Sequence, residues 1–116
     1  MKLNELLGIE FPIIQGGMAN IATGAFAAAV SNAGALGLVA SGRMDAEALR
    51  AEIRAATANT RNPFGVTLLL MHPHTAALPQ VVAAEGGPVV TTRAGHPRQA
   101  DPAWQEAGIK AFPAVT

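Results

Sequence analysis

Five short apolar runs constrain the fold of this chain more than any other feature of its sequence. They lie at residues 11–14, 35–40, 64–70, 88–92 and 109–115. The runs are continuous rather than alternating, which is typical of strands that are buried on both faces of a parallel sheet. Helix signals occupy the intervals between them. The chain is therefore predicted to repeat a strand–helix unit four times and to end on a fifth strand.

The first predicted helix covers residues 24–33. Thr23 can accept a hydrogen bond at its start, and Gly34 suits the left-handed residue that commonly ends a helix. Phe26 and Val30 are four residues apart and therefore share one face of this helix.

The clearest helix is predicted at 46–59, with Asp45 as its cap and a proline at position 63 beyond its end. Apolar residues recur along it at helical spacing, and charged residues fall between them, as in a helix that covers a core. The apolar stripe consists of Leu49, Ile53 and Ala56, and the residues turned to water are Arg50, Glu52 and Arg54. Weaker signals predict helices at 75–85 and 101–107.

Two architectures fit this single domain of residues 1–116. One is a five-stranded doubly wound sheet of the flavodoxin type, which closes at about this length. The other is the first half of a TIM (β/α)₈ barrel, since a complete barrel needs about 200 residues or more. Pattern alone favours the doubly wound sheet. The missing helix after the fifth strand argues against it, because that fold normally ends on a helix.

The composition excludes several classes of function. Lys and Arg number 8, Asp and Glu number 8, and no basic run occurs, so no nucleic-acid partner is predicted. Cysteine is absent, and His72 and His74 flank a proline without a carboxylate neighbour, so a solvated loop is favoured over a metal site. No apolar stretch approaches the roughly 18 residues of a membrane span, and the N-terminus lacks the apolar core of a signal peptide. A cytoplasmic protein without a membrane partner is expected.

A glycine-rich turn follows the first apolar run, in the stretch QGGMANIATG at residues 15–24. Neither the dinucleotide fingerprint nor a Walker lysine is present. Gly16 and Gly17 remove Cβ atoms at the carboxyl end of a predicted strand, where α/β proteins bind ligands. One interpretation is a tight turn that needs a positive φ. The other is a backbone surface cleared for a ligand, with the amides of Met18 and Ala19 facing it.

The segment PIIQGGMANIATGAFAAAVSNAGALGLVASG, residues 12–42, resembles the start of the FMN-dependent enoyl-acyl-carrier-protein reductase II and nitronate monooxygenase (2-nitropropane dioxygenase) family. The resemblance continues in PFGVTLLL, VVTTRAG and QEAGIKAFPAV, and so covers nearly the whole chain in order. It implies the N-terminal half of a TIM barrel that holds FMN at the carboxyl ends of its strands.

The resemblance also implies which residues contact the flavin. The turn with Gly17, Met18 and Ala19 would lie against the ring, and the end of the second strand at Ala40 and Ser41 would lie near it. Thr67 stands where relatives carry an asparagine that bonds the ring, and it is shorter and has no amide. The fourth strand and its loop would contribute Thr92, Ala94 and Gly95, whereas Arg93 and His96 depart from the family pattern.

For the activity, the resemblance implies an oxidoreductase of fatty acid synthesis. NAD(P)H would reduce the flavin, which would then reduce an enoyl thioester, a small molecule or one bound to acyl carrier protein. Oxidation of alkyl nitronates with O₂ is the close alternative. Both activities fit these residues, because the pocket that distinguishes them lies further along the barrel.

The family's catalytic histidine and phosphate-binding loops match nothing within residues 1–116, so no catalytic residue is assigned. The remaining hypothesis is a non-catalytic half-barrel that functions only by oligomerisation. Half a barrel has open sheet edges, so a homo-oligomer is expected.

Overall fold

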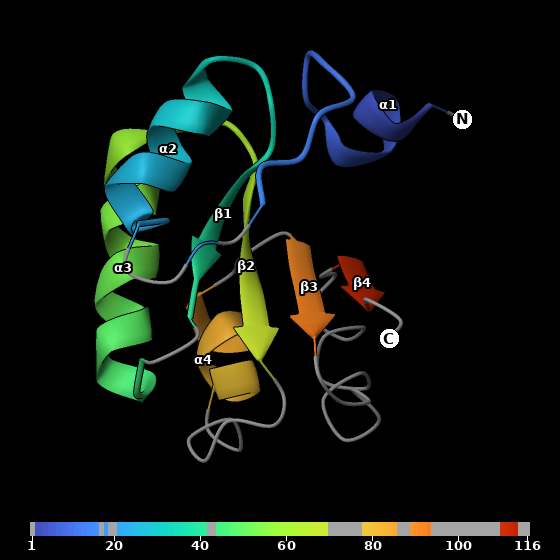
Figure 1. The fold of residues 1–116 in the computed structure, drawn as a ribbon. Coiled ribbons are helices and arrows are strands. Elements are labelled where there is room, and N and C mark those ends of the chain that lie inside the picture. The colour runs from blue at the N-terminus through green and yellow to red at the C-terminus, as the bar shows by residue number, and fades with distance from the viewer. Residues whose placement is uncertain are drawn as a thin grey trace.

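The computed structural model describes residues 2–16, 18, 21–41, 44–69, 78–85, 89–93 and 110–113. After a short first helix, helices and strands alternate as far as the third strand (Figure 1). The helices are α1 (Leu3–Leu7), α2 (Gly24–Asn32), α3 (Ala46–Asn59) and α4 (Leu78–Glu85), and the strands are β1 (Gly37–Ala40), β2 (Phe64–Leu69), β3 (Val89–Arg93) and β4 (Lys110–Pro113). The helix predicted at 101–107 lies outside the described residues.

All four strands are parallel and lie in chain order, β1-β2-β3-β4. A bridge between Ile14 and Leu36 places the segment 13–15 beside the residues that lead into β1. A flavodoxin-type sheet would instead insert its first strand between the second and third. Consecutive order without a switch point therefore rules out the doubly wound alternative and matches the start of a barrel.

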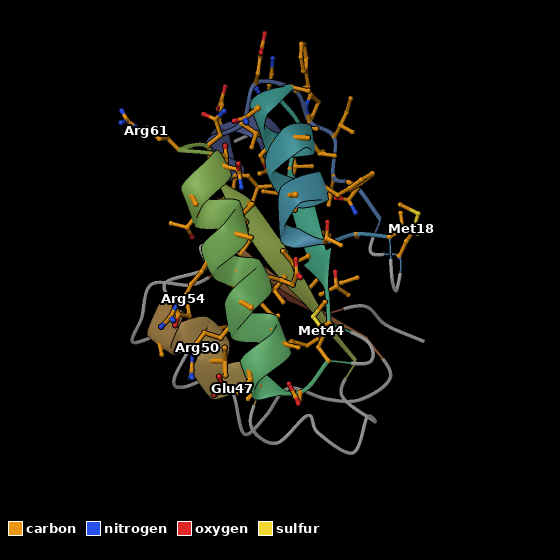
Figure 2. All side chains as sticks on the ribbon, turned by 90° about the vertical axis from the view of Figure 1, so that its left-hand side faces the viewer. Met18, Met44, Glu47, Arg50, Arg54 and Arg61 are labelled. Carbon is orange, nitrogen blue, oxygen red and sulfur yellow. The ribbon has the colours of Figure 1, made fainter. Side chains whose placement is uncertain are left out.

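Three helices cover one face of this sheet. Helices α2 and α3 lie to the left of the strands in Figure 1 and stand in front of them in Figure 2, and α4 contributes Val81 and Val82 to the same core. Their apolar side chains meet the outward-facing residues of β1, β2 and β3 in one buried cluster. This core consists of Ala27, Val39, Leu49, Ile53, Ala56, Phe64, Val66, Leu68, Val81, Val82 and Val90. The predicted stripe on α3 is confirmed as the buried face of that helix.

Helix α2 packs against the strand and helix next to it with almost no space between the backbones. A Cβ added to Gly37 would lie 1.9 Å from the carbonyl oxygen of Ala27, and one added to Gly24 would lie 2.0 Å from that of Glu52. Only glycine permits this approach. The buried face of α2 accordingly consists of small residues, namely Gly24, Ala27, Ala28 and Ser31. Phe26, which the sequence places on one face with Val30, is 37% exposed.

Both predicted helix caps are confirmed. The side chain of Thr23 accepts a hydrogen bond from the amide of Phe26 at 3.2 Å, and the carboxylate of Asp45 accepts one from Ala48 at 2.8 Å. Gly34 has a φ of 107°, as expected of the residue that follows α2.

We expect Asp45→Ala to lower the free energy of unfolding by about 1 kcal/mol, because one amide at the start of α3 loses its acceptor. Urea denaturation followed by circular dichroism measures this change. Asp45→Asn is the matched control, since its side-chain oxygen can cap the helix equally well. An equal loss in both variants would contradict the capping role.

The charged side chains of α3 do more than face water. Arg50 and Arg54 both pair with Glu85 of α4, at 3.2 and 3.1 Å. The carboxylate of Glu52 accepts a hydrogen bond from the amide of Gly24 at 2.8 Å and so holds the start of α2. The Arg54 side chain is 68% exposed, as the sequence indicates. Arg50 and Glu52 are only partly exposed, because neighbouring helices bring partners within reach.

Helix α1 covers part of the other face of the sheet, near the amino ends of the strands. Leu7 is buried against Leu36, Leu38 and Val89, with Leu3 and Ile9 packed beside them. The sequence interpretation missed this helix. Its signals were the leucines at Leu3 and Leu7, four residues apart, and the glycine at position 8, which has a φ of 71° at the helix end.

The strand predicted at 11–14 is wrong in extent and in burial. The structure contains only the single bridge at Ile14, and the side chains of Phe11 and Ile13 are 46% and 57% exposed. This apolar run lies at the open edge of the sheet, where no strand of the described chain covers it.

Among the helices of the described part, none is long and apolar enough to cross a bilayer.

Candidate functional site

The carboxyl ends of β1, β2 and β3 meet at one edge of the sheet. Ala40 pairs with Thr67, and Thr67 pairs with Thr91, so the three residues form one row across the strands. Side chains alternate between the two faces of a sheet. Since Val39, Val66 and Val90 enter the helix-covered core, this row belongs to the opposite face, which is the interior side in a barrel.

The hydroxyl groups of Thr67 and Thr91 are bonded to each other at 2.8 Å. Each hydroxyl has one hydrogen and can accept two bonds, so the pair uses one hydrogen and leaves the other available. The pair can therefore donate one hydrogen bond to a polar atom placed above this row.

Ser41 is the residue that directly follows β1. Its side chain is 1% exposed, and its hydroxyl donates to the carbonyl oxygen of Thr67 at 2.6 Å. Its amide donates to the same oxygen at 3.2 Å. The hydroxyl hydrogen is thus used within the protein, and Ser41 serves the site by tying β1 to β2 directly beside Thr67.

The loop that precedes α2 is bound to the carboxyl end of β1. The carbonyl oxygen of Met18 accepts bonds from the amides of Ile21 and Ala22, and the carbonyl oxygen of Ala22 accepts one from Ala40 at 2.9 Å. The Met18 side chain is 42% exposed and points outward from the loop (Figure 2). These bonds place the loop at the edge where the threonine pair lies.

Gly16 differs from the other described glycines, because nothing in the described chain requires a glycine there. A Cβ at this position would meet no heavy atom within 4 Å, and its φ lies outside the left-handed region. The interpretation of this turn as one that needs a positive φ is therefore wrong for Gly16. The space beside its backbone is open in the part of the chain that the structure describes.

The other predicted contacts are described only in part. Thr92 lies in β3 and pairs with Leu68. Gly17, Ala19, Ala94 and Gly95 lie outside the described residues, as do all three histidines, and their roles stay predictions. The sequence interpretation missed Thr91, because the alignment of β3 with β2 decides which of two adjacent threonines neighbours Thr67. It also missed Gln15, whose side chain accepts a hydrogen bond from the amide of Leu38 at 2.9 Å.

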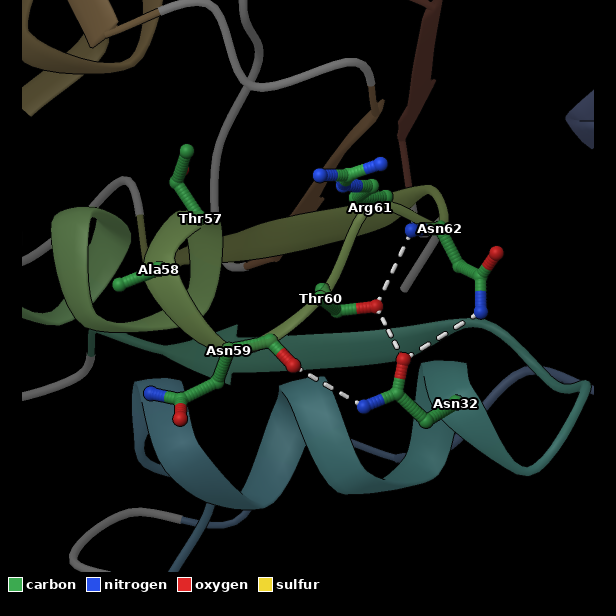
Figure 3. Close-up of a pocket in the computed structure, with 7 residues that line it drawn as sticks. All are labelled: Asn32, Thr57, Ala58, Asn59, Thr60, Arg61 and Asn62. Atoms are coloured by element: carbon green, nitrogen blue, oxygen red, sulfur yellow. Dashed lines mark hydrogen bonds between the residues drawn. The ribbon is translucent and has the colours of Figure 1, made fainter.

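An open hollow lies at the opposite end of the sheet, near the amino ends of the strands (Figure 3). Asn32 is one of the residues that line it. The side chain of Asn32 donates to the carbonyl oxygen of Asn59 and accepts from Thr60 and Asn62. Its polar atoms bind one another and join α2 to the loop before β2, which is a stabilising role typical of this end of a barrel.

No group of three or more metal-binding side chains occurs among the residues that the structure describes. Among the carboxylates there, Asp45 caps α3, Glu52 accepts the amide of Gly24, and Glu47 and Glu85 form ion pairs. The arrangement therefore offers backbone surface and hydroxyl groups to a ligand at the carboxyl ends of the strands.

A sequence model described as nitronate monooxygenase matches residues 1–96. The chain belongs to the nitronate monooxygenase family. This is a family of flavin-dependent monooxygenases and reductases.

Individual relatives agree with this assignment. A nitronate monooxygenase of Paraburkholderia phytofirmans is 46% identical over 71 residues, which are 61% of this chain and 19% of that protein. The "(3aS,4S,5R,7aS)-5-hydroxy-7a-methyl-1-oxo-octahydro-1H-indene-4-carboxyl-CoA dehydrogenase" of Mycobacterium tuberculosis is 33% identical over 113 residues, 97% of this chain and 32% of that protein.

The structure of FabK from Thermotoga maritima superposes on this chain with a TM-score of 0.94 and 42% identity. The match covers 98% of this chain and 37% of FabK, which is a TIM barrel. The chain therefore corresponds to the N-terminal portion of a TIM barrel. The part that matches is about a fifth to two fifths of the length of these relatives.

Proposed function

We propose that this chain supplies the first part of an FMN-binding face in an oxidoreductase that uses NAD(P)H to reduce an enoyl thioester. The observation that carries the proposal is Gly16, the described glycine that neither its φ nor any contact explains. FMN would supply hydride transfer, and the protein would bind and orient it.

The chain's own residues would hold the ring in a defined way. The backbone from Gly16 to Met18 would lie against one face, and Gly17 and Ala19 would continue that surface. The hydroxyl hydrogen that the Thr67–Thr91 bond does not use would donate to a ring carbonyl. Ala94 and Gly95 would close the neighbouring side of the site, whereas Thr92 pairs with the core residue Leu68 and would contribute through its backbone. Phosphate binding and proton transfer would fall to other parts of a complete barrel.

A thioester substrate is favoured by the relative that matches almost the whole chain. That protein is named as a dehydrogenase of a carboxyl-CoA compound and aligns over 97% of these residues. The FabK structure aligns over a similar share at higher identity.

Nitronate oxidation with O₂ is the second candidate. The family description and the relative from Paraburkholderia phytofirmans both name this activity. Both reactions would use the same flavin face, so these residues serve either of them.

The visible absorption spectrum of the purified protein, recorded after incubation with FMN and gel filtration, tests the proposal. We expect flavin bands that elute with the protein. In a complete barrel that contains these residues, consumption of NAD(P)H that depends on an enoyl thioester would then support the reductase, and oxygen uptake with an alkyl nitronate would support the alternative. A colourless protein would contradict the proposed flavin site.

We further propose that the 116-residue chain associates with itself when it is produced alone. Phe11 and Ile13 are 46% and 57% exposed at the open edge of the sheet, and such edges pair with other strands. Sedimentation velocity should detect dimers or larger species. Ile13→Lys should shift the distribution toward monomer, whereas Ala51→Lys on the exposed surface of α3 should not. A monomeric wild-type chain would contradict this proposal.

A further inference from the structure

The side chain of Gln15 occupies the place of a main-chain carbonyl in the sheet. The amide of Gln15 donates to the carbonyl oxygen of Leu36, and the amide of Leu36 donates to that of Ile13, both at 2.9 Å. In a parallel pair the next bond would join the amide of Leu38 to the main-chain oxygen of residue 15. Instead, the side-chain oxygen of Gln15 accepts the bond from Leu38 at 2.9 Å.

Because the side-chain oxygen takes the place of the main-chain oxygen, the strand pairing ends at Gln15. The main chain is released from the sheet, while the amide of the buried Leu38 keeps an acceptor. The side-chain nitrogen of Gln15 in turn donates to the carbonyl oxygen of Gly16 at 2.5 Å. Both the oxygen and the nitrogen of the carboxamide are thus hydrogen-bonded, and they connect β1 to Gly16.

We infer that Gln15 is a positioning residue, whose carboxamide fixes the backbone of Gly16 in the orientation that a flavin ring requires. The inference rests on the proposed flavin site. It needs one acceptor and one donor on the same side chain, which glutamine provides. A methionine of equal length provides neither, and an ionised glutamate provides only acceptors, one of which would face the carbonyl oxygen of Gly16.

Two measurements on Gln15→Met test this role. Residue-resolved hydrogen exchange should show the amide of Leu38 exchanging about tenfold faster or more, because it loses its acceptor, with little change at Leu36. Binding of FMN, followed by quenching of flavin fluorescence, should weaken about tenfold or more. The matched control is Asn32→Ala, which removes side-chain bonds at the opposite end of the sheet. It should lower the melting temperature while changing FMN affinity by less than about threefold.

Gln15→Glu provides a rescue that a merely structural residue would not show. A protonated glutamic acid has a carbonyl oxygen for Leu38 and a hydroxyl hydrogen for Gly16, as glutamine does. FMN binding by this variant should therefore strengthen as the pH falls through the pKa of the new side chain, relative to wild type at the same pH. If Gln15→Met does not fold, the pH dependence of FMN binding by Gln15→Glu still tests the positioning role of Gln15.

The outcomes separate the two proposals. If the wild-type protein binds FMN and Gln15→Met binds it equally well, Gln15 has no positioning role and only this inference fails. Equal losses of FMN affinity in Gln15→Met and Asn32→Ala would also overturn it, because both would then act through stability. If the wild-type protein binds no FMN, the proposed function fails and this inference fails with it.

Discussion

Gly37→Ala is expected to lower the free energy of unfolding by about 3 kcal/mol or more, which is a large part of the stability of a small domain. The new Cβ would lie 1.9 Å from the carbonyl oxygen of Ala27 and 2.6 Å from its carbonyl carbon. Both are backbone atoms of α2, so no side chain can rotate away. The strand is also held in place, because the amide of Gly37 donates to the hydroxyl of the buried Ser31 at 3.0 Å.

Urea denaturation followed by circular dichroism measures the loss. Gly16→Ala is the matched control, since its Cβ meets no heavy atom within 4 Å, and its effect should stay within about 0.5 kcal/mol. If the two variants unfold at the same urea concentration, helix α2 does not pack on β1 as closely as the structure has it.

Local signals of the sequence were sufficient to predict most helices and strands. Helix 46–59 was predicted with its cap and both bounds, because an acidic cap, a periodic apolar stripe and a terminating proline all agree there. The strands at β2 and β3 were predicted to within a residue at their starts, since each is a continuous apolar run with a proline beside it. The alternative architecture was rejected only by the strand order, which depends on contacts between distant residues.

The run at 11–14 shows where such signals fail. Its apolarity predicted a buried strand, but apolarity only indicates that side chains avoid water in the complete assembly. In the described chain the run pairs at a single bridge and is otherwise open. Burial of an edge segment depends on what lies beyond that edge, and the local sequence carries no information about it.

The structure brings several of the predicted site residues together at one edge of the sheet. The resemblance led to Met18, Ser41 and Thr67, and the structure places all three near the carboxyl ends of β1 and β2. The partner of Thr67 could not be chosen between Thr91 and Thr92 without the register of β2 and β3. The role of Gln15 depends on a bond across 23 residues, which no local pattern indicates.

The two glycines at positions 37 and 16 have opposite surroundings, and this contrast leads to the second large effect. Gly37 is required by the protein's own backbone, whereas the space next to Gly16 is empty in the described chain. We therefore expect Gly16→Val to unfold at nearly the same urea concentration as wild type. It should nevertheless weaken FMN binding about tenfold or more, because a branched side chain would occupy the surface proposed for the ring.

Retention of FMN after gel filtration and titration of flavin fluorescence measure the effect. Ile21→Val is the matched control, since it changes an exposed side chain of the same loop without adding volume. If Gly16→Val binds FMN as wild type does, the ring does not lie on this turn. If it fails to fold, the space beside Gly16 is filled in the folded protein by the chain itself. Only a folded variant with weakened FMN binding agrees with a glycine retained for a ligand.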